Sequence, residues 1–183
     1  TKMSDYVWED IQQDRLNEEM LESASNLGTG VLHYYWDNSY TGGITQRWVG
    51  KLCGESIDPI NIFFGNPQCR EVQKQPWIII SKREMVETVR ERAKKNGARA
   101  DEIALIQGDS DTREEGYDAA QYEVKDGEKC TVLIRYRKKN GVIYWYEVCN
   151  GVTITPEKPM TVVDEMGVER SVRLYPIVVM NWK

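Results

Sequence analysis

One histidine and four cysteines are the side chains of this chain best suited to catalytic or metal chemistry. His33 lies in a β-prone run with no thiol or carboxylate near it in sequence, so we expect a packed side chain rather than a base or a ligand. None of the cysteines forms a C-x-x-C pair, which disfavours a structural zinc site. We expect free thiols in a reducing, intracellular setting. The cysteines are Cys53, Cys69, Cys130 and Cys149.

Two short motifs resemble parts of enzyme active sites but lack residues that the chemistry needs. Gly28-Thr29-Gly30 has His33 where a dinucleotide fingerprint needs its third glycine, and it follows a predicted helix instead of a strand. It therefore predicts the end of a helix. Gly54 begins a segment that resembles a nucleophile elbow, but Asp58 stands where the closing glycine belongs. The sequence thus predicts no enzyme, no catalytic residues and no cofactor.

A third motif, Asp109-Ser110-Asp111, begins like a calcium-binding loop. Glu114 occupies the position of the sharp-turn glycine, and Ala120 occupies that of the final glutamate. We therefore expect a mobile acidic loop over 108–120 and no metal site, with a weak divalent-ion site or a partner contact as the alternatives.

The strongest structural pattern lies between residues 129 and 155. Asn140-Gly141 and Asn150-Gly151 are each flanked by β-prone runs, which predicts a three-stranded antiparallel meander with two-residue turns. In this register Arg137 faces Tyr144 and Arg135 faces Tyr146. The other face carries Cys130 and Cys149 diagonally, as core thiols.

The resulting arginine–tyrosine face, Arg135, Arg137, Tyr144 and Tyr146, is the main candidate for an interaction site. Residues 129–139 contain five basic residues and no acidic one. Cross-strand cation–π pairs on a solvated face explain this composition, and phosphate contact or partner docking is the functional alternative. A predicted helix at about 82–96 carries further basic candidates on its exposed face: Arg83, Arg90 and Lys94.

Length and composition favour one soluble globular domain, and the predicted elements, two main helices with mostly antiparallel strands, give an α+β class. The chain has 183 residues, a net charge of −5 and no apolar run long enough to span a bilayer. This acidity excludes a generally basic nucleic-acid binder. Because the last residues are strand-like, we also expect the chain to be a fragment of a longer protein.

The remaining elements follow from periodicity and from helix caps. Residues 4–27 predict one amphipathic helix that ends at Gly28, and the S-x-x-E box at Ser81–Glu84 predicts the start of the second main helix. A short helix is expected at 100–106. Other strands are expected at 31–36, 44–52, 60–64, 77–80, 160–164, 168–174 and 177–180.

The order of several segments resembles the wing region of tailed-phage portal proteins, the head-to-tail connectors. A long helix exits through Gly-Thr-Gly into an aromatic-rich strand and a Gly50-Lys51 strand. Asp58-Pro59-Ile60-Asn61-Ile62-Phe63 follows, and Pro76-Trp77-Ile78-Ile79-Ile80 leads into a helix that ends in glycine. Pro176-Ile177-Val178 lies in the last segment. This pattern covers most of the chain, although each motif is weak by itself.

The resemblance implies a structural, non-enzymatic protein of the virion. Portal proteins form a homo-oligomeric ring of about twelve subunits at one capsid vertex, through which double-stranded DNA passes without sequence-specific contacts. The capsid protein, the terminase and the tail adaptor would be the partners, in the virion or in the bacterial cytoplasm during assembly, with no membrane involved. Across a ring interface, the acidic segment 98–128 and the basic helix 82–95 are candidates to meet. A stand-alone module that binds protein or nucleic acid through the arginine–tyrosine face is the alternative.

Overall fold

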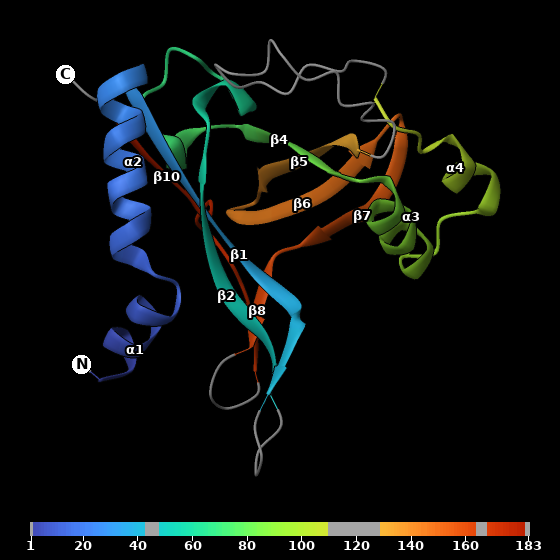
Figure 1. Cartoon of the computed structure of the whole chain (residues 1–183), viewed down its shortest axis with the longest axis horizontal. Helices are drawn as coiled ribbons and strands as arrows, with labels where there is room; N and C mark the ends of the chain where they lie inside the picture. The colour runs from blue at the N-terminus through green and yellow to red at the C-terminus, as the bar shows by residue number, and fades with distance from the viewer. Residues whose placement is uncertain (1, 43–47, 110–128, 164–167, 182–183) are drawn as a thin grey trace, which may run out of the picture. The chain divides into compact units, whose positions relative to one another are not determined.

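The computed structural model describes residues 2–42, 48–109, 129–163 and 168–181, in an α+β fold with mostly antiparallel sheets (Figure 1). The chain forms two compact units. The first contains Thr1–Ile62, Gln68–Lys74 and Tyr175–Lys183, and the second contains Phe63–Pro67 and Gln75–Leu174. The α+β class and the antiparallel sheets confirm the prediction from the sequence.

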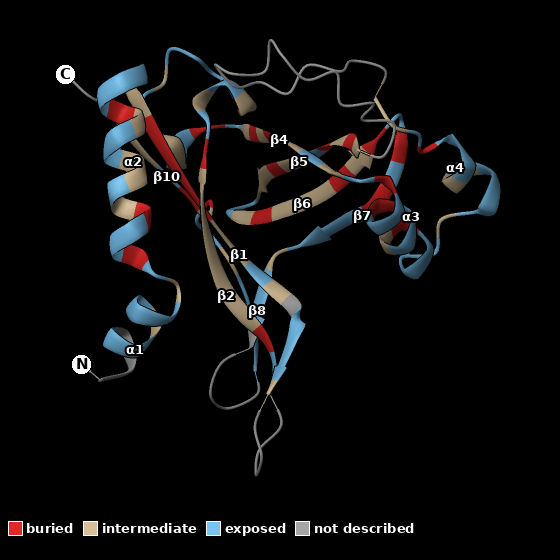
Figure 2. Ribbon diagram, in the orientation of Figure 1, coloured by how far each residue is buried: buried red, intermediate tan, exposed pale blue. Residues whose placement is uncertain are grey.

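The first unit is a three-stranded antiparallel sheet with helices on one face. Its elements in chain order are α1 (Lys2–Asp10), α2 (Gln13–Leu27), β1 (Thr29–Gly42), β2 (Trp48–Ile57), the short 3₁₀ helices η1 (Pro59–Asn61) and η2 (Val72–Lys74), and β10 (Ile177–Asn181). The strand order is β10-β1-β2. Leu16 and Ala24 on α2 are buried, as are Val31 and Leu32 on β1 (Figure 2).

The single helix predicted over 4–27 is wrong in its first part. Gln12 adopts a left-handed conformation (φ 53°, ψ 50°), which separates α1 from α2. The apolar pattern steps five residues from Ile11 to Leu16, too far for one continuous helix to keep both on the same face. The predicted end at Gly28 is confirmed, because this residue caps α2 with φ 81°.

Strand β1 is longer than expected. The sequence predicts a strand at 31–36 followed by a loop, but β1 continues to Gly42 because it pairs with β2, with a register shift between Asp37 and Thr41. Residues 43–47, which include the start of the strand predicted at 44–52, lie outside the described residues. The last strand, β10, returns to β1, with Thr29 opposite Asn181 and His33 opposite Ile177.

The second unit contains a five-stranded sheet of order β3-β4-β5-β6-β7. Its strands are β3 (Ile62–Phe64), β4 (Trp77–Met85), β5 (Lys129–Lys139), β6 (Val142–Cys149) and β7 (Val152–Pro159). The helices α3 (Val86–Lys95) and α4 (Ala100–Leu105) follow β4. The strands β8 (Thr161–Val163) and β9 (Glu169–Ser171) form a separate antiparallel pair.

The predicted meander is present with the predicted register. Arg135 faces Tyr146, Tyr136 faces Trp145, and Arg137 faces Tyr144. Asn140 and Asn150 have positive φ (50° and 48°), and each is followed by a glycine with positive φ, as type I′ turns require. One face of β5 is buried, including Cys130, Val132, Ile134 and Tyr136.

The start of the second main helix was predicted wrongly. Residues 81–85 extend β4, where Ser81 pairs with Leu133 and Met85 with Lys129, and the helix begins only at Val86. Ser81 therefore caps nothing, and the N-cap residue Met85 makes no side-chain capping bond. Sheet pairing with β5 outweighs the local capping signal. The mobile acidic loop predicted over 108–120 lies outside the described residues from 110 onward.

Candidate functional site: the cation–aromatic face of the meander

Arg135 is the centre of the candidate site, between two aromatic rings on neighbouring strands. Its guanidinium carbon lies 5.4 Å from the centroid of Trp77 on β4 and 5.9 Å from that of Tyr146 on β6. Its Nη1 also donates a hydrogen bond of 3.0 Å to the Tyr146 hydroxyl. The Nε atom is buried and has no acceptor among the described residues. The two rings attract the cation and hold the guanidinium group between them.

Arg137 is neutralised on the same face by a carboxylate. It forms a bidentate ion pair with Glu157 on β7, with Nη2 2.8 Å from Oε2, and Lys139 contacts the same carboxylate at 2.7 Å. Hydrogen bonds from Arg137 and then from Lys139 lower the pKa of Glu157 to about 2. Lys139 also lies 5.0 Å from the centroid of the Tyr144 ring.

The seven predicted interaction residues do not form one cluster. Arg135, Arg137, Tyr144 and Tyr146 share one face of the sheet, as expected from the register. Arg83 lies on that face opposite Thr131, with its Nε 3.9 Å from the Asp109 carboxylate. The other two residues, Arg90 and Lys94, lie on α3, where Arg90 donates two hydrogen bonds to the carbonyl of Ile106 and Lys94 is exposed.

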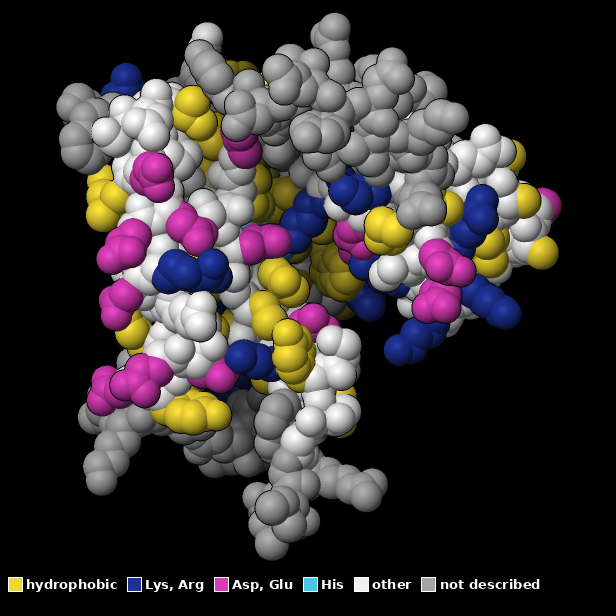
Figure 3. Space-filling view, viewed as in Figure 1, with side chains coloured by type: hydrophobic (Ala, Val, Ile, Leu, Met, Phe, Trp, Pro, Cys, Tyr) yellow, Lys and Arg dark blue, Asp and Glu magenta, His cyan; other side chains and the backbone are white. Residues whose placement is uncertain are grey.

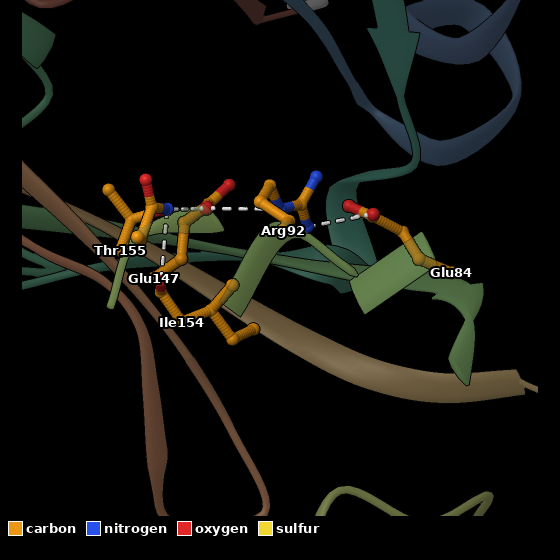
Figure 4. Close-up of polar contacts among 6 residues, drawn as sticks. Glu84, Arg92, Glu147, Ile154 and Thr155 are labelled. Carbon is orange, nitrogen blue, oxygen red and sulfur yellow. Dashed lines mark hydrogen bonds and ion pairs between the residues drawn. The ribbon is translucent and has the colours of Figure 1, made fainter. Parts of the chain in front are cut away.

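A polar network that the sequence analysis missed attaches α3 to the sheet (Figure 4). Arg92 lies between two carboxylates, 2.8 Å from Glu84 on β4 and 3.3 Å from Glu147 on β6. Thr155 donates a hydrogen bond to Glu147, and Asn96 donates one of 3.0 Å to the Ile154 carbonyl. Glu147 is buried and lies on the same face of β6 as the core residues Ile143 and Cys149. A carboxylate on the predicted core face was the available signal.

His33 also has a partner that its sequence neighbourhood does not reveal. Its Nδ1 lies 2.6 Å from Oε1 of Glu55 on β2, and the side chain is 1% exposed. The ring stacks on Tyr35, with centroids 5.5 Å apart. Burial, followed by the charge of Glu55, raises the pKa of Tyr35 to about 12. His33 is thus a packed histidine, as predicted, but with a carboxylate contact from the neighbouring strand.

The two glycine-containing motifs have structural roles in the first unit. Gly30 lies under α2, where an added Cβ would stand 2.2 Å from the Met20 carbonyl oxygen. Gly54 and Ser56 lie within β2 rather than at a strand-to-helix turn, and Asp58 accepts a hydrogen bond from the Ile60 N–H to cap η1. Neither motif has the local geometry that its enzyme class requires.

Asp109 is held by protein contacts at the start of the predicted acidic loop. Its carboxylate accepts a hydrogen bond of 2.6 Å from Thr131. Within the described ranges, no three His, Cys, Asp or Glu side chains come together in a group that could hold a metal ion. In the same ranges, no helix is long and apolar enough to cross a bilayer.

The first unit contains a separate open hollow of about 380 Å³ between α2 and the end of β2. Three of its lining residues are acidic, Glu19, Glu22 and Asp58, and the others are small, amide or apolar: Ser23, Asn26, Leu27, Ser56 and Ile57. The lining is thus mostly apolar surface, with three carboxylates and a few hydrogen-bonding groups around it.

Comparison of the whole chain with protein-family models finds no match, and comparison with curated proteins finds none either.

Proposed function

We propose that this chain is a structural, non-enzymatic module: the wing region of a tailed-phage portal protein. In this proposal it forms part of a homo-oligomeric ring of about twelve subunits at the capsid vertex, used for DNA packaging and for joining head to tail. The capsid protein, terminase and tail adaptor are its partners. The module occupies the virion, and the bacterial cytoplasm during assembly.

The observation that carries the proposal is the correspondence between the resembling segments and successive elements. Gly28 ends α2 and opens the aromatic-rich β1. The Asp58–Phe63 segment forms the capped turn η1 and most of β3, and Trp77 begins β4. The Pro176-Ile177 segment starts β10, which runs antiparallel to β1 and ends with Asn181 beside Thr29. The segments that resemble the portal wing thus coincide, in the same order, with successive helices and strands.

The chemistry of the described residues also favours a structural role. His33 is buried and contacts the Glu55 carboxylate of the neighbouring strand, as a packed histidine does. The arginines of the candidate face are held by rings and by Glu157. Such side chains stabilise a sheet and give it a fixed charge pattern.

Electron microscopy of the protein encoded by the full reading frame that contains this chain tests the proposal. Negative-stain images should show rings with a central channel, and mass photometry should give one large oligomer. Monodisperse small particles at micromolar concentration would contradict it. Lys94→Glu should weaken the ring, because the basic helix is the predicted contact across the subunit interface. Arg15→Glu on α2 reverses the same charge at another exposed position and should not weaken it.

A second candidate is a stand-alone binding module that uses the arginine–tyrosine face. The cation–ring pairs around Arg135 and Lys139 favour it, because aromatic rings and cations on a sheet suit nucleic-acid or protein contacts. Fluorescence polarisation should then show salt-sensitive binding of a labelled oligonucleotide that is lost in Arg135→Gln and Arg137→Gln. Binding unchanged in both variants would reject this alternative.

A further inference from the structure

The outer edge of β2 carries backbone groups that point away from the sheet. Successive residues of an antiparallel strand direct their N–H and C=O groups to opposite sides. The Tyr34 N–H donates to the Pro176 carbonyl at 2.9 Å, so the even-numbered residues of β1 face β10 and the odd-numbered ones face β2. Through the β1–β2 register, Leu52, Gly54 and Ser56 point outward. Among the described residues, no strand pairs with this side of β2.

The acidic hollow begins at the same edge. The even-numbered side chains of β2 face α2, because a Cβ added to Gly54 would stand 2.6 Å from Cδ1 of Leu16. Ser56 lines the hollow from β2, and Glu19 and Glu22 line it from α2. A strand placed beside β2 would direct the side chain opposite Ser56 to the face that α2 covers. That side chain would enter the hollow.

We propose that the outer edge of β2 binds an extended basic peptide segment of another protein by antiparallel strand addition, with one arginine or lysine side chain in the acidic hollow. The outward N–H and C=O groups of Leu52, Gly54 and Ser56 supply hydrogen bonds that any extended peptide can use. The carboxylates of the hollow supply the selectivity for a cation. This inference goes beyond the portal proposal and does not depend on it.

The surrounding charge supports a basic partner. Residues 1–30 contain seven acidic and two basic residues. Figure 3 shows Asp and Glu side chains distributed along α2. Glu22 is exposed at the hollow, while Glu19 forms an ion pair with Arg15 at 3.1 Å. A peptide with an acidic residue opposite Ser56 would meet like charges, so the edge should discriminate by the sign of one side chain.

Peptide titration of the ¹⁵N-labelled 183-residue chain, followed by NMR, tests the proposal. The probe is acetyl-Thr-Arg-Thr-Val-Thr-Val-Thr-amide, whose Arg and two Val residues can stand opposite Ser56, Gly54 and Leu52. We expect saturable shifts at residues 52–56 and at the hollow. The same peptide with Glu in place of Arg should bind at least about tenfold more weakly. No saturable shift up to about 1 mM, or equal affinity of both peptides, would overturn the proposal.

Two matched pairs separate strand addition from simple charge attraction. N-methylation of the central Val removes an N–H that faces β2 and should weaken binding about tenfold, whereas N-methylation of the next Thr, which faces away, should change it less than about twofold. Glu22→Gln should weaken the Arg peptide about threefold or more, and Glu18→Gln, exposed on the same helix but outside the hollow, should not. Equal effects within either pair would reject the proposed geometry.

Discussion

The indole ring of Trp36 lies directly against the backbone of Gly50. A Cβ atom added to Gly50 would stand 1.9 Å from the indole nitrogen, and Gly50 also has φ +88°. Any side chain here must therefore displace the ring and adopt a strained backbone conformation at the same time. Trp36 itself is 57% exposed, and the missing side chain at Gly50 leaves the space that its ring occupies.

Gly50→Ala should therefore destabilise the first unit by about 2 kcal/mol or more, the sum of left-handed strain and a steric clash. Gly28→Ala is the matched control, because Gly28 also has positive φ but nothing within 4 Å of an added Cβ. It should lose only about 1 kcal/mol. Urea unfolding measures both, and equal losses would show that the clash is relieved without cost.

The Glu157 ion pairs should stabilise the protein in a pH-dependent way. The folded pKa of Glu157, about 2, lies below the usual value of 4.5, so this stabilisation is present above pH 4.5 and is lost as the pH falls toward 2. Because the side chains are partly exposed, Glu157→Gln should cost no more than about 1 kcal/mol at pH 7. Urea unfolding should show that the wild-type protein and Glu157→Gln differ less in free energy of unfolding at pH 3 than at pH 7. A constant difference would contradict the assignment.

Arg135 and Tyr146 should be energetically coupled. A double-mutant cycle of Arg135→Gln and Tyr146→Phe isolates the 3.0 Å hydrogen bond, because phenylalanine keeps the ring beside the cation. We expect a coupling energy of about 0.5–1 kcal/mol from denaturant unfolding. The cycle of Arg135→Gln with Tyr40→Phe, in the other unit, should give none.

Arg92 should be essential for keeping Glu147 in the sheet core. Arg92→Gln leaves a buried carboxylate without its cation and should cost about 2–3 kcal/mol, toward the low end for such sites because Arg92 is partly exposed. Adding Glu147→Gln should recover part of that loss in thermal unfolding. If the double variant is as unstable as the sum of the single ones, Glu147 does not depend on Arg92.

The four thiols should react with a disulfide reagent in two groups. Burial, with a hydrogen bond that Cys149 donates to Cys130, raises the pKa of Cys149 to about 12, and burial also raises the pKa of Cys130. Both should stay unmodified at pH 8 until the protein is unfolded, while the partly exposed Cys69 and Cys53 react in the native state. Mass spectrometry of labelled peptides over time would identify the order, and early labelling of Cys149 would contradict it.

The sequence predicted the parts of the fold whose signals are local and unopposed. Two Asn-Gly turns determined the meander register, and with it the positions of Arg135 and Tyr146 on one face. The capping box at Ser81 failed because β5, almost fifty residues away, offers those residues a strand partner. No local pattern contains that information.

Long-range contacts also explain what was missed at the candidate sites. Glu55 reaches His33 only through the β1–β2 register, and Glu157 reaches Arg137 only because β7 lies beside β6. The left-handed Gln12 was visible only as an irregular five-residue step between apolar positions. Such features depend on tertiary pairing, which a single sequence does not specify.

The pairing of β10 with β1 has a consequence for synthesis on the ribosome. Thr29 and Asn181 are 152 positions apart, so the first unit cannot complete its sheet until its last strand has emerged. Most of the second unit, Gln75–Leu174, is continuous and precedes that strand. The internal segment can therefore fold first, while β1 keeps the backbone edge that β10 later pairs with open to wrong strand pairing.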